Sequence, residues 1–196
     1  MSTVLGLLLA AGEGRRMGTP KALLYDGQGG SFLLRAVDVL RDGGCASVSV
    51  VLGARADEAA ALLDGATGPG DAAPRVVRAD DWAEGMGASL RAGLRAALDG
   101  DATCALVSLV DLPDVGAPVV RRMLDSLGSQ KDVLGRASYA GTPGHPVLIG
   151  RDHWSGVVES ARGDRGARDY LRENPPTLVE CGDLATGRDV DTPHQL

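Results

Sequence analysis

The stretch LAAGEGRRMGTPK, residues 9–21, combines glycines with basic side chains. Three cations lie within seven residues of one another: Arg15, Arg16 and Lys21. Gly12 and Gly14 let backbone N–H groups approach a ligand closely, and successive N–H groups of this kind bind anions. The alternative is an ordinary glycine turn with solvated basic residues. The number of cations, and the position of the loop directly after an apolar run, favour a phosphate-binding loop.

This loop fits neither of the two common nucleotide-binding patterns. Gly12, Gly14 and Gly18 form G-x-G-x-x-x-G, which is one residue longer than the dinucleotide fingerprint. A Walker A loop ends in Gly-Lys-Ser/Thr, whereas Lys21 follows a proline. A loop that holds phosphates without either template is therefore expected.

Acidic residues follow the apolar runs at two further places. Asp111 comes directly after ALVSLV, where a carboxylate can bind Mg²⁺ together with substrate phosphates and water. A turn or helix cap is the alternative for Asp111, and the nearby Asp114 is expected to be a local cap. Near the C-terminus, GRDVDTP contains Asp189 and Asp191, and Asp191 would equally suit the N-cap of a helix that begins at Thr192-Pro193.

The elements that must position these residues alternate between strand and helix patterns. Strands are predicted over 3–11, 46–53, 75–79, 103–110, 133–139, 146–149 and 178–181. Helices are predicted over 32–40, 57–63, 89–98, 118–127 and 167–172, with Ser31 as the N-cap of the first. This order predicts an α/β fold with a mostly parallel sheet and helices on both faces, in which ligands bind beyond the carboxyl ends of the strands.

Composition restricts the classes of protein to consider. The 196 residues are 44% hydrophobic, which suits one domain over 1–196. A net charge of −6 with 3% aromatic residues argues against a nucleic-acid binder. The three cysteines have neither zinc nor disulfide spacing. Neither a signal peptide nor a membrane-spanning run is evident, so we expect a cytoplasmic protein without a membrane partner.

The opening loop resembles the signature of the MobA-like nucleotidyltransferases, roughly L-A-[AG]-G-x-x-x-R-M-G-x-[PD]-K. The resemblance implies a three-layer Rossmann-like fold of the GT-A type, with a nucleotide-binding half (1–115) and an acceptor-side half (130–196). In this family the loop holds the triphosphate of an NTP. The implied contacts are Leu9, Ala10, Ala11, Gly12, Gly14, Arg16 and Lys21, and the implied catalytic residues are Arg16, Lys21 and Asp111.

The same resemblance implies a metal site. The family places a metal-binding Asp where Asp111 stands, and its [ND]-[IV]-[ND]-T-P segment, matched by the C-terminal DVDTP, returns to the metal–triphosphate site. Asp111 and Asp191 are accordingly expected to bind Mg²⁺, or Mn²⁺ as an alternative, with Asp191 favoured over Asp189. His194 stands where the family often has an acidic residue, which bears on the helix start rather than on chemistry.

The stretch DDWAEGMGASLRAGL, residues 80–94, bears on the choice of nucleotide. Its residue types indicate a flexible loop before a helix, in which Met86 is equally a core or hinge residue and Ser89 a helix cap. The stretch resembles the W-[AS]-x-G-[ML]-x-x-S-[LI] run of the molybdenum cofactor cytidylyltransferase branch, and it lacks the G-P-L-A-G loop of the guanylyl branch. The resemblance implies CTP, with base and ribose contacts from Gly85, Met86, Gly87 and Ser89.

In the second half, GTPGHPVLIG and GDRGARDYL resemble acceptor-side segments of the same branch. They imply that His145 and Arg168 bind the second substrate, although a lone His is more often structural. The implied reaction transfers CMP from CTP to the terminal phosphate of molybdopterin, with or without molybdenum, and the product passes to a molybdoenzyme or its chaperone. The alternatives are a guanylyltransferase, a transferase for sugar or alcohol phosphates, or a non-catalytic cofactor carrier.

Overall fold

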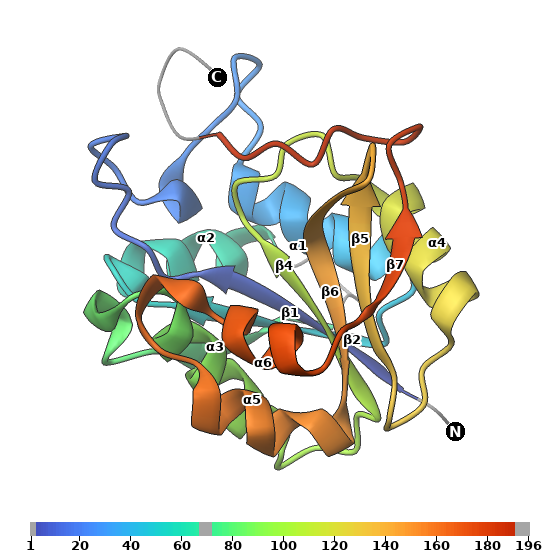
Figure 1. Ribbon diagram of the computed structural model, residues 1–196. Coiled ribbons are helices and arrows are strands. Elements are labelled where there is room, and N and C mark those ends of the chain that lie inside the picture. The colour runs from blue at the N-terminus through green and yellow to red at the C-terminus, as the bar shows by residue number, and fades with distance from the viewer. Residues whose placement is uncertain (1–2, 67–71, 191–196) are drawn as a thin grey trace.

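One mixed β-sheet joins the two halves of the chain in the computed structural model, which describes residues 3–66 and 72–190 (Figure 1). Its strands run in the order β3-β2-β1-β4-β6-β5-β7. Neighbouring strands are parallel except that β6 runs antiparallel to both β4 and β5. The strands are β1 Val4–Ala10, β2 Ser47–Leu52, β3 Arg75–Arg78, β4 Cys104–Leu109, β5 Leu134–Tyr139, β6 Thr142–Gly150 and β7 Thr177–Glu180.

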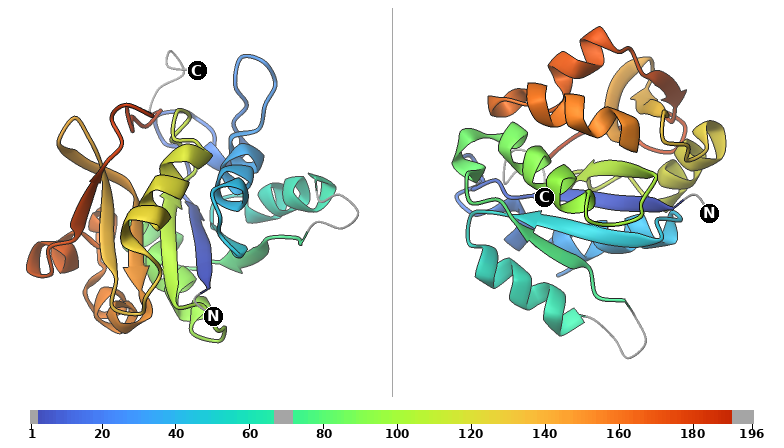
Figure 2. Two further views of the ribbon diagram at one scale, coloured as in Figure 1. Left: turned by 90° about the vertical axis from the view of Figure 1, so that its right-hand side faces the viewer. Right: turned by 90° about the horizontal axis from the view of Figure 1, so that it is seen from below.

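Helices cover both faces of this sheet and complete a three-layer α/β fold (Figure 2). One face carries α1 (Phe32–Asp42), α2 (Ala56–Ala66) and α4 (Ala117–Leu127). The other face carries α3 (Met86–Ala97), α5 (Trp154–Ser160) and α6 (Arg168–Glu173). Short 3₁₀ turns occur at Lys21–Leu23, Trp82–Glu84, Arg151–His153 and Gly163–Arg165. Within the described residues, no helix has both the length and the apolar character needed to cross a membrane.

Two apolar cores explain the continuous hydrophobic run of β1. Leu8 packs in the core beneath α1 and α4, whereas Leu7 and Leu9 pack in the core beneath α3. Leu7 and Leu8 are fully buried. Each such side chain contributes roughly 1.5–3 kcal/mol to stability relative to exposure. The predicted strand over 3–11, buried on both faces, is confirmed, and it holds the opening loop at its carboxyl end.

The predicted helix over 89–98 was wrong at its start, because α3 begins at Met86. Gly85 is the N-cap with φ 113°, and Ser89 lies buried inside the helix without a capping role. A side chain at Gly87 would lie 2.8 Å from the backbone nitrogen of Arg162. The glycines that suggested a flexible loop thus allow close packing of α3 against a later segment.

The sequence GTPGH, residues 141–145, predicts the turn between β5 and β6, but only Gly141 of these residues lies in the turn. Residues 142–145 belong to β6, since Tyr139 pairs with Thr142. Ala140 and Gly141 form the turn, with φ values of 51° and 79°. Such left-handed values are required by the tight turns that join antiparallel strands. As a consequence, His145 lies on a strand and not in a loop.

Candidate functional site

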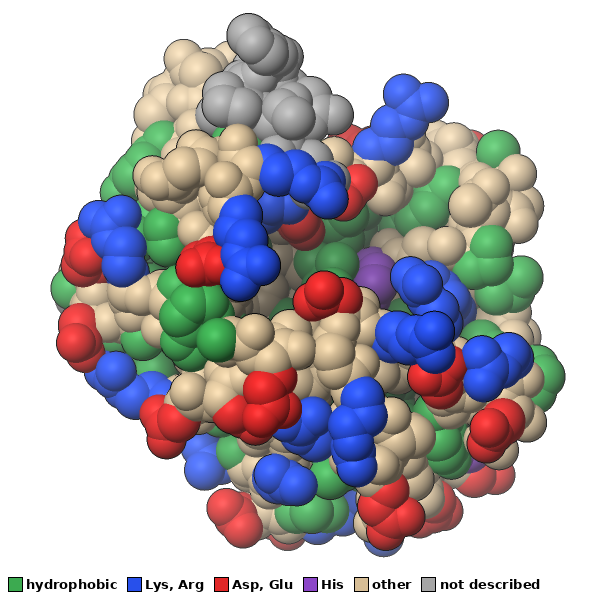
Figure 3. Space-filling view, turned by 60° about the vertical axis from the view of Figure 1, so that its left-hand side comes forward, with side chains coloured by type: hydrophobic (Ala, Val, Ile, Leu, Met, Phe, Trp, Pro, Cys, Tyr) green, Lys and Arg blue, Asp and Glu red, His purple; other side chains and the backbone are tan. Residues whose placement is uncertain are grey.

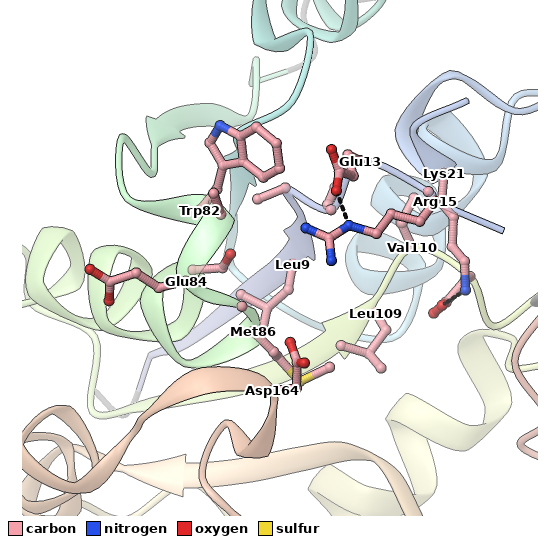
Figure 4. Close-up of a pocket in the computed structure, with 18 residues that line it drawn as sticks. Leu9, Glu13, Arg15, Lys21, Trp82, Glu84, Met86, Leu109, Val110 and Asp164 are labelled. Carbon is pink, nitrogen blue, oxygen red and sulfur yellow. Dashed lines mark hydrogen bonds and ion pairs between the residues drawn. The ribbon is translucent and has the colours of Figure 1, made fainter. Parts of the chain in front are cut away.

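A cavity of about 380 Å³ opens where β1 and β4 end (Figure 4). Ligands bind at this edge in open α/β sheets. Three segments line the cavity: the opening loop, the turn that leads into α3, and the end of β4. The lining residues are Leu9, Ala10, Ala11, Gly12, Glu13, Gly14, Arg15, Lys21, Trp82, Ala83, Glu84, Gly85, Met86, Ser89, Leu109, Val110, Asp111 and Asp164.

Lys21 and Asp111 form an ion pair in this cavity. The distance from Lys21 Nζ to Asp111 Oδ2 is 2.6 Å, and both side chains are mostly buried. The other carboxylate oxygen, Asp111 Oδ1, is buried and has no hydrogen-bond partner among the described residues. Burial raises the pKa of Asp111, while the ammonium group of Lys21 lowers it. A buried oxygen without a partner is costly, so the site is built for a ligand that binds this oxygen.

The surroundings of Asp111 fit a divalent cation. In the described part of the chain, no cluster of three or more His, Cys, Asp or Glu is arranged as a metal cage. Mg²⁺ needs no such cage, because it binds one or two carboxylates and takes phosphate oxygens and water as its other ligands. A further charge comes from Asp189, which raises the pKa of Asp111. The backbone N–H of Val190 donates to the carbonyl oxygen of Asp111 over 3.0 Å.

The tail that carries Asp189 is fastened beside the cavity. Asp114, expected to be a local cap, instead accepts a hydrogen bond from the backbone N–H of Thr186 over 2.6 Å. This contact and the Val190–Asp111 bond hold the tail at the end of β4. Asp191, the favoured second metal ligand, lies outside the described residues.

The opening loop is shaped by tight backbone contacts. Gly14 has φ 65°, and a side chain there would lie 1.9 Å from the carbonyl oxygen of Thr19. Only glycine fits this position. Arg15 extends over the cavity and pairs with Glu13 (Figure 4). Arg16, the arginine singled out from the sequence, is exposed and does not line the cavity.

A second wall is formed by the residues that lead into α3. Gly85, Met86 and Ser89 line the cavity as expected for a site near a base, whereas Gly87 does not. Gly87 is buried against the 162–164 segment. The same segment brings Asp164 into the cavity beside Met86 (Figure 4).

Arg91 of α3 ties this wall together. Its side chain is 9% exposed and donates to Asp81 Oδ2 at 2.8 Å and to Glu84 Oε2 at 2.7 Å. A third bond runs from its guanidinium to the carbonyl oxygen of Ala161, over 3.0 Å. One buried cation therefore holds both the segment before α3 and the segment that leads to Asp164.

The two expected acceptor residues lie outside the cavity lining. His145 is on β6, and Arg168 is the first residue of α6. Burial lowers the pKa of His145 to about 4, and the positive charge of Arg136 on β5 lowers it further. His145 is therefore neutral at neutral pH.

Several lining residues were missed from the sequence. Trp82 and Asp164 both line the cavity, although neither is among the candidate site residues of the sequence. Arg91 and its two acids match no known motif, and its third partner, the carbonyl oxygen of Ala161, is distant in sequence. The spacing of Asp81, Glu84 and Arg91 along one helix entry is the signal that could have indicated Arg91.

Comparisons of the sequence with known proteins give one family and two relatives. The pattern described as the MobA-like NTP transferase domain matches residues 6–178. The chain is 37% identical over 203 residues to a protein of Paenarthrobacter nicotinovorans named nicotine blue oxidoreductase, covering 98% of this chain and 94% of that protein. It is 58% identical over 38 residues to a probable molybdenum cofactor guanylyltransferase of Rhodopirellula baltica, covering 19% and 18% of the two chains.

Two solved structures show the same fold. A nucleotidyl transferase from Methanothermobacter superposes with a TM-score of 0.79 at 22% identity, over 98% of this chain and 93% of that one. The Mycobacterium tuberculosis protein Rv0371c, in a complex with manganese, gives a TM-score of 0.66 at 26% identity, over 92% and 87% of the chains. The predicted nucleotidyltransferase fold is thus confirmed.

Proposed function

The chain belongs to the MobA-like NTP transferase family, and from that premise we propose that it transfers CMP from CTP to the terminal phosphate of molybdopterin, with or without bound molybdenum, and releases pyrophosphate. Residues 1–115 would bind the nucleotide and residues 130–196 the acceptor. The observation that carries this proposal is the buried, unpartnered Oδ1 of Asp111 beside Lys21, in a cavity that the opening loop lines.

The proposed chemistry needs no protein nucleophile. An oxygen of the acceptor phosphate forms a bond to the α-phosphorus of CTP, the bond from that phosphorus to the bridging oxygen breaks, and its electron pair leaves with pyrophosphate. The attacking phosphate is already an anion. The protein has to align the two phosphates and neutralise their charge, which are the main contributions to catalysis of phosphoryl-type transfers.

The proposed roles of Lys21, Asp111 and the loop follow from their positions in the cavity, and those of Arg16 and Asp191 from the family resemblance. Lys21, Arg16 and the backbone N–H groups of residues 9–14 would hold the β- and γ-phosphates. Asp111 and Asp191 would bind Mg²⁺ or Mn²⁺, and the bound cation would neutralise phosphate charge. The manganese complex of Rv0371c, a similar protein, supports a divalent metal.

The choice of nucleotide and the choice of acceptor-binding residues are supported by different observations. The likeness of residues 80–94 to the cytidylyltransferase branch favours CTP, with Gly85, Met86, Gly87 and Ser89 near the base and ribose. The short match to a guanylyltransferase makes GTP the alternative. His145 and Arg168 are proposed on the acceptor side. We further propose a cytoplasmic location and delivery of the product to a molybdoenzyme or its chaperone.

One experiment tests this function. The protein is incubated with molybdopterin, Mg²⁺ and CTP, GTP or ATP in separate reactions, and the products are identified by mass. We expect the cytosine dinucleotide and an equal amount of pyrophosphate. A guanine dinucleotide would move the assignment to the guanylyl branch, and no dinucleotide with any NTP would overturn it.

Two rival functions are tested in the same preparation. The name of the Paenarthrobacter relative suggests reduction of nicotine blue, which a reduced nicotinamide nucleotide and the dye would reveal by absorbance. The Lys21–Asp111 pair argues against that reaction, because hydride transfer makes no use of a phosphate- and metal-binding pair. A non-catalytic carrier would bind molybdopterin tightly and release no pyrophosphate.

A further inference from the structure

We propose that Arg136 and Arg168 form an anion-binding subsite beside the nucleotide cavity, and that this subsite holds the phosphate monoester group of the acceptor. The assignment rests on the proposed function and deepens it, because it adds Arg136 and states which group of the second substrate is bound. His145, which is neutral, lies next to Arg136.

Strand pairing places the subsite directly alongside the cavity. Leu9 of β1 pairs with Leu109 of β4, and both line the cavity. In the antiparallel pair of β4 and β6, Val107 lies opposite Val147, the last pair before each strand reaches the edge where the cavity opens. His145 precedes Val147 by two residues on β6, and Leu109 follows Val107 by two residues on β4. His145 therefore lies on the strand next to the cavity wall, near the same edge of the sheet.

Arg136 extends toward the same edge from the next strand. It pairs with Val147 in the register of β5 and β6. Its Nε donates to the carbonyl oxygen of Gly144 over 2.8 Å, and its Nη2 to that of Pro143 over 3.4 Å. These bonds direct the guanidinium along β6 past His145, and its Nη1 has no hydrogen-bond partner among the described residues.

Arg168 approaches from the helix layer above this face. It begins α6, two residues after Gly166, where a side chain would lie 3.2 Å from Met86 Sδ in the cavity wall. The start of α6 is thus held next to the nucleotide cavity. The surface in this direction is hollowed, with a histidine side chain inside the hollow and basic side chains on both of its sides (Figure 3).

The charges of the two arginines are not balanced by acids. Burial lowers the pKa of Arg136, and the positive charge of Arg168 lowers it further. Among the described residues, neither arginine makes a salt bridge. The nearest acid in sequence, Asp169, is already paired with two other side chains, those of Arg165 and Arg172. Two adjacent cations without an acid repel each other, so an anion between them is stabilised.

The geometry of the proposed reaction indicates that the anion between Arg136 and Arg168 is the acceptor phosphate and not a phosphate of the nucleotide. The attacking and leaving oxygens of such a transfer lie roughly in line on opposite sides of the phosphorus. The opening loop follows β1 and is proposed to hold the leaving pyrophosphate. Beyond β4 and Asp111, the sheet continues with β6 and β5, which carry His145 and Arg136. The subsite therefore lies on the side from which the nucleophile must approach.

Steady-state kinetics test the assignment in the working enzyme. For Arg136→Gln we expect the KM for molybdopterin to rise about tenfold, since one charged hydrogen bond is lost, while the KM for CTP stays within about twofold. Arg122→Gln is the matched control, because this arginine of α4 pairs with Asp183 on the opposite face of the sheet and should leave both values unchanged. Dinucleotide formation with an unchanged acceptor KM in Arg136→Gln would overturn the subsite.

A binding measurement tests whether the subsite binds a phosphate monoester, independently of whether the proposed transfer reaction occurs. Phenyl phosphate and inorganic phosphate are titrated into the protein while the guanidinium Nε–H signals of Arg136 and Arg168 are followed by NMR. Saturable shifts with the monoester are expected, also in Lys21→Ala, and in Arg136→Gln the Arg168 signal should need about tenfold more ligand. A response to inorganic phosphate alone, or none, overturns the subsite. A monoester response without dinucleotide formation leaves the subsite standing and overturns the proposed reaction.

Discussion

The nucleotide cavity and the arginine subsite, which form the two ends of one cleft, differ in how their charges are balanced. Around the opening loop, cations are paired with acids: Lys21 lies 2.6 Å from Asp111, and Arg15 contacts Glu13. Around β5 and α6, Arg136 and Arg168 are adjacent and make no salt bridge to a described acid. A paired site suits a nucleotide whose phosphates are already neutralised by a metal, whereas an unbalanced pair of cations suits a bare anion. This contrast in charge is the basis for proposing a different substrate at each end of the cleft.

The largest effect is expected at the paired end. Asp111→Ala and Lys21→Ala should each lower kcat by about 10²–10³-fold, because each removes a charge positioned for the reacting phosphates. Both variants should keep the secondary structure seen by circular dichroism but melt at a lower temperature, because each leaves one charge of a mostly buried ion pair without its partner. Asp99→Ala, at the far end of α3, is the matched control and should keep full activity. Near-normal rates in either cavity variant would show that the pair serves another purpose.

An intermediate effect is expected at the wall between the two ends. Arg91→Lys should raise the KM for CTP about tenfold and cost about 2 kcal/mol of stability, because one ammonium group cannot replace three directed hydrogen bonds. The measurements are kinetics and chemical denaturation. Arg151→Lys is the matched control, as this arginine donates to Leu98, Gly100 and Ala102 at the other end of α3. If both variants lose stability alike and neither changes the KM, Arg91 has only a structural role.

A smaller effect should distinguish the two loop arginines. Arg16→Ala should lower kcat/KM for CTP about fivefold, the upper range for an exposed charge contact. Arg15→Ala should change it less, since Glu13 already neutralises that side chain. If Arg15→Ala lowers kcat/KM more than Arg16→Ala does, the phosphate contact is made by Arg15, which lines the cavity, and not by Arg16.

The smallest effect concerns the titration of His145 at the unbalanced end. Its pKa is lowered from 6.5 to about 4 by burial and by Arg136, so NMR should detect a midpoint far below that of a free histidine. Because the unfolded chain takes up this proton first, the stabilisation is full above pH 6.5 and declines as the pH falls toward 4. Arg136→Gln should raise the midpoint. A midpoint that does not change would place Arg136 too far from His145 to share a ligand with it.

Local patterns predicted most of the fold. The buried strands, the helix that Ser31 caps and the glycine-rich loop after β1 depend on nearby residues, and the structure confirms them. Ser31 Oγ accepts a hydrogen bond from the backbone N–H of Leu34 over 3.4 Å. These features depend on burial periodicity and cap chemistry, which act within a few residues.

Long-range packing decided the rest. Gly85 caps α3 and Gly87 lies in its first turn, and the segment at 162–164 packs closely against both glycines. The same packing brings Asp164 into the cavity, and sheet pairing brings His145 and Arg136 to its side. None of these partners lies close in sequence to the residues it meets.

By itself, therefore, the sequence determined the α/β order, the glycine-rich basic loop after β1 and the acid that follows β4, because each follows from local residue types. Only the tertiary structure decided that Lys21 lies against Asp111, that one carboxylate oxygen is left buried without a partner, and that two distant arginines are neighbours. The physical reason is that charge balance depends on distance in space, which strand order and register set and which spacing along the chain does not.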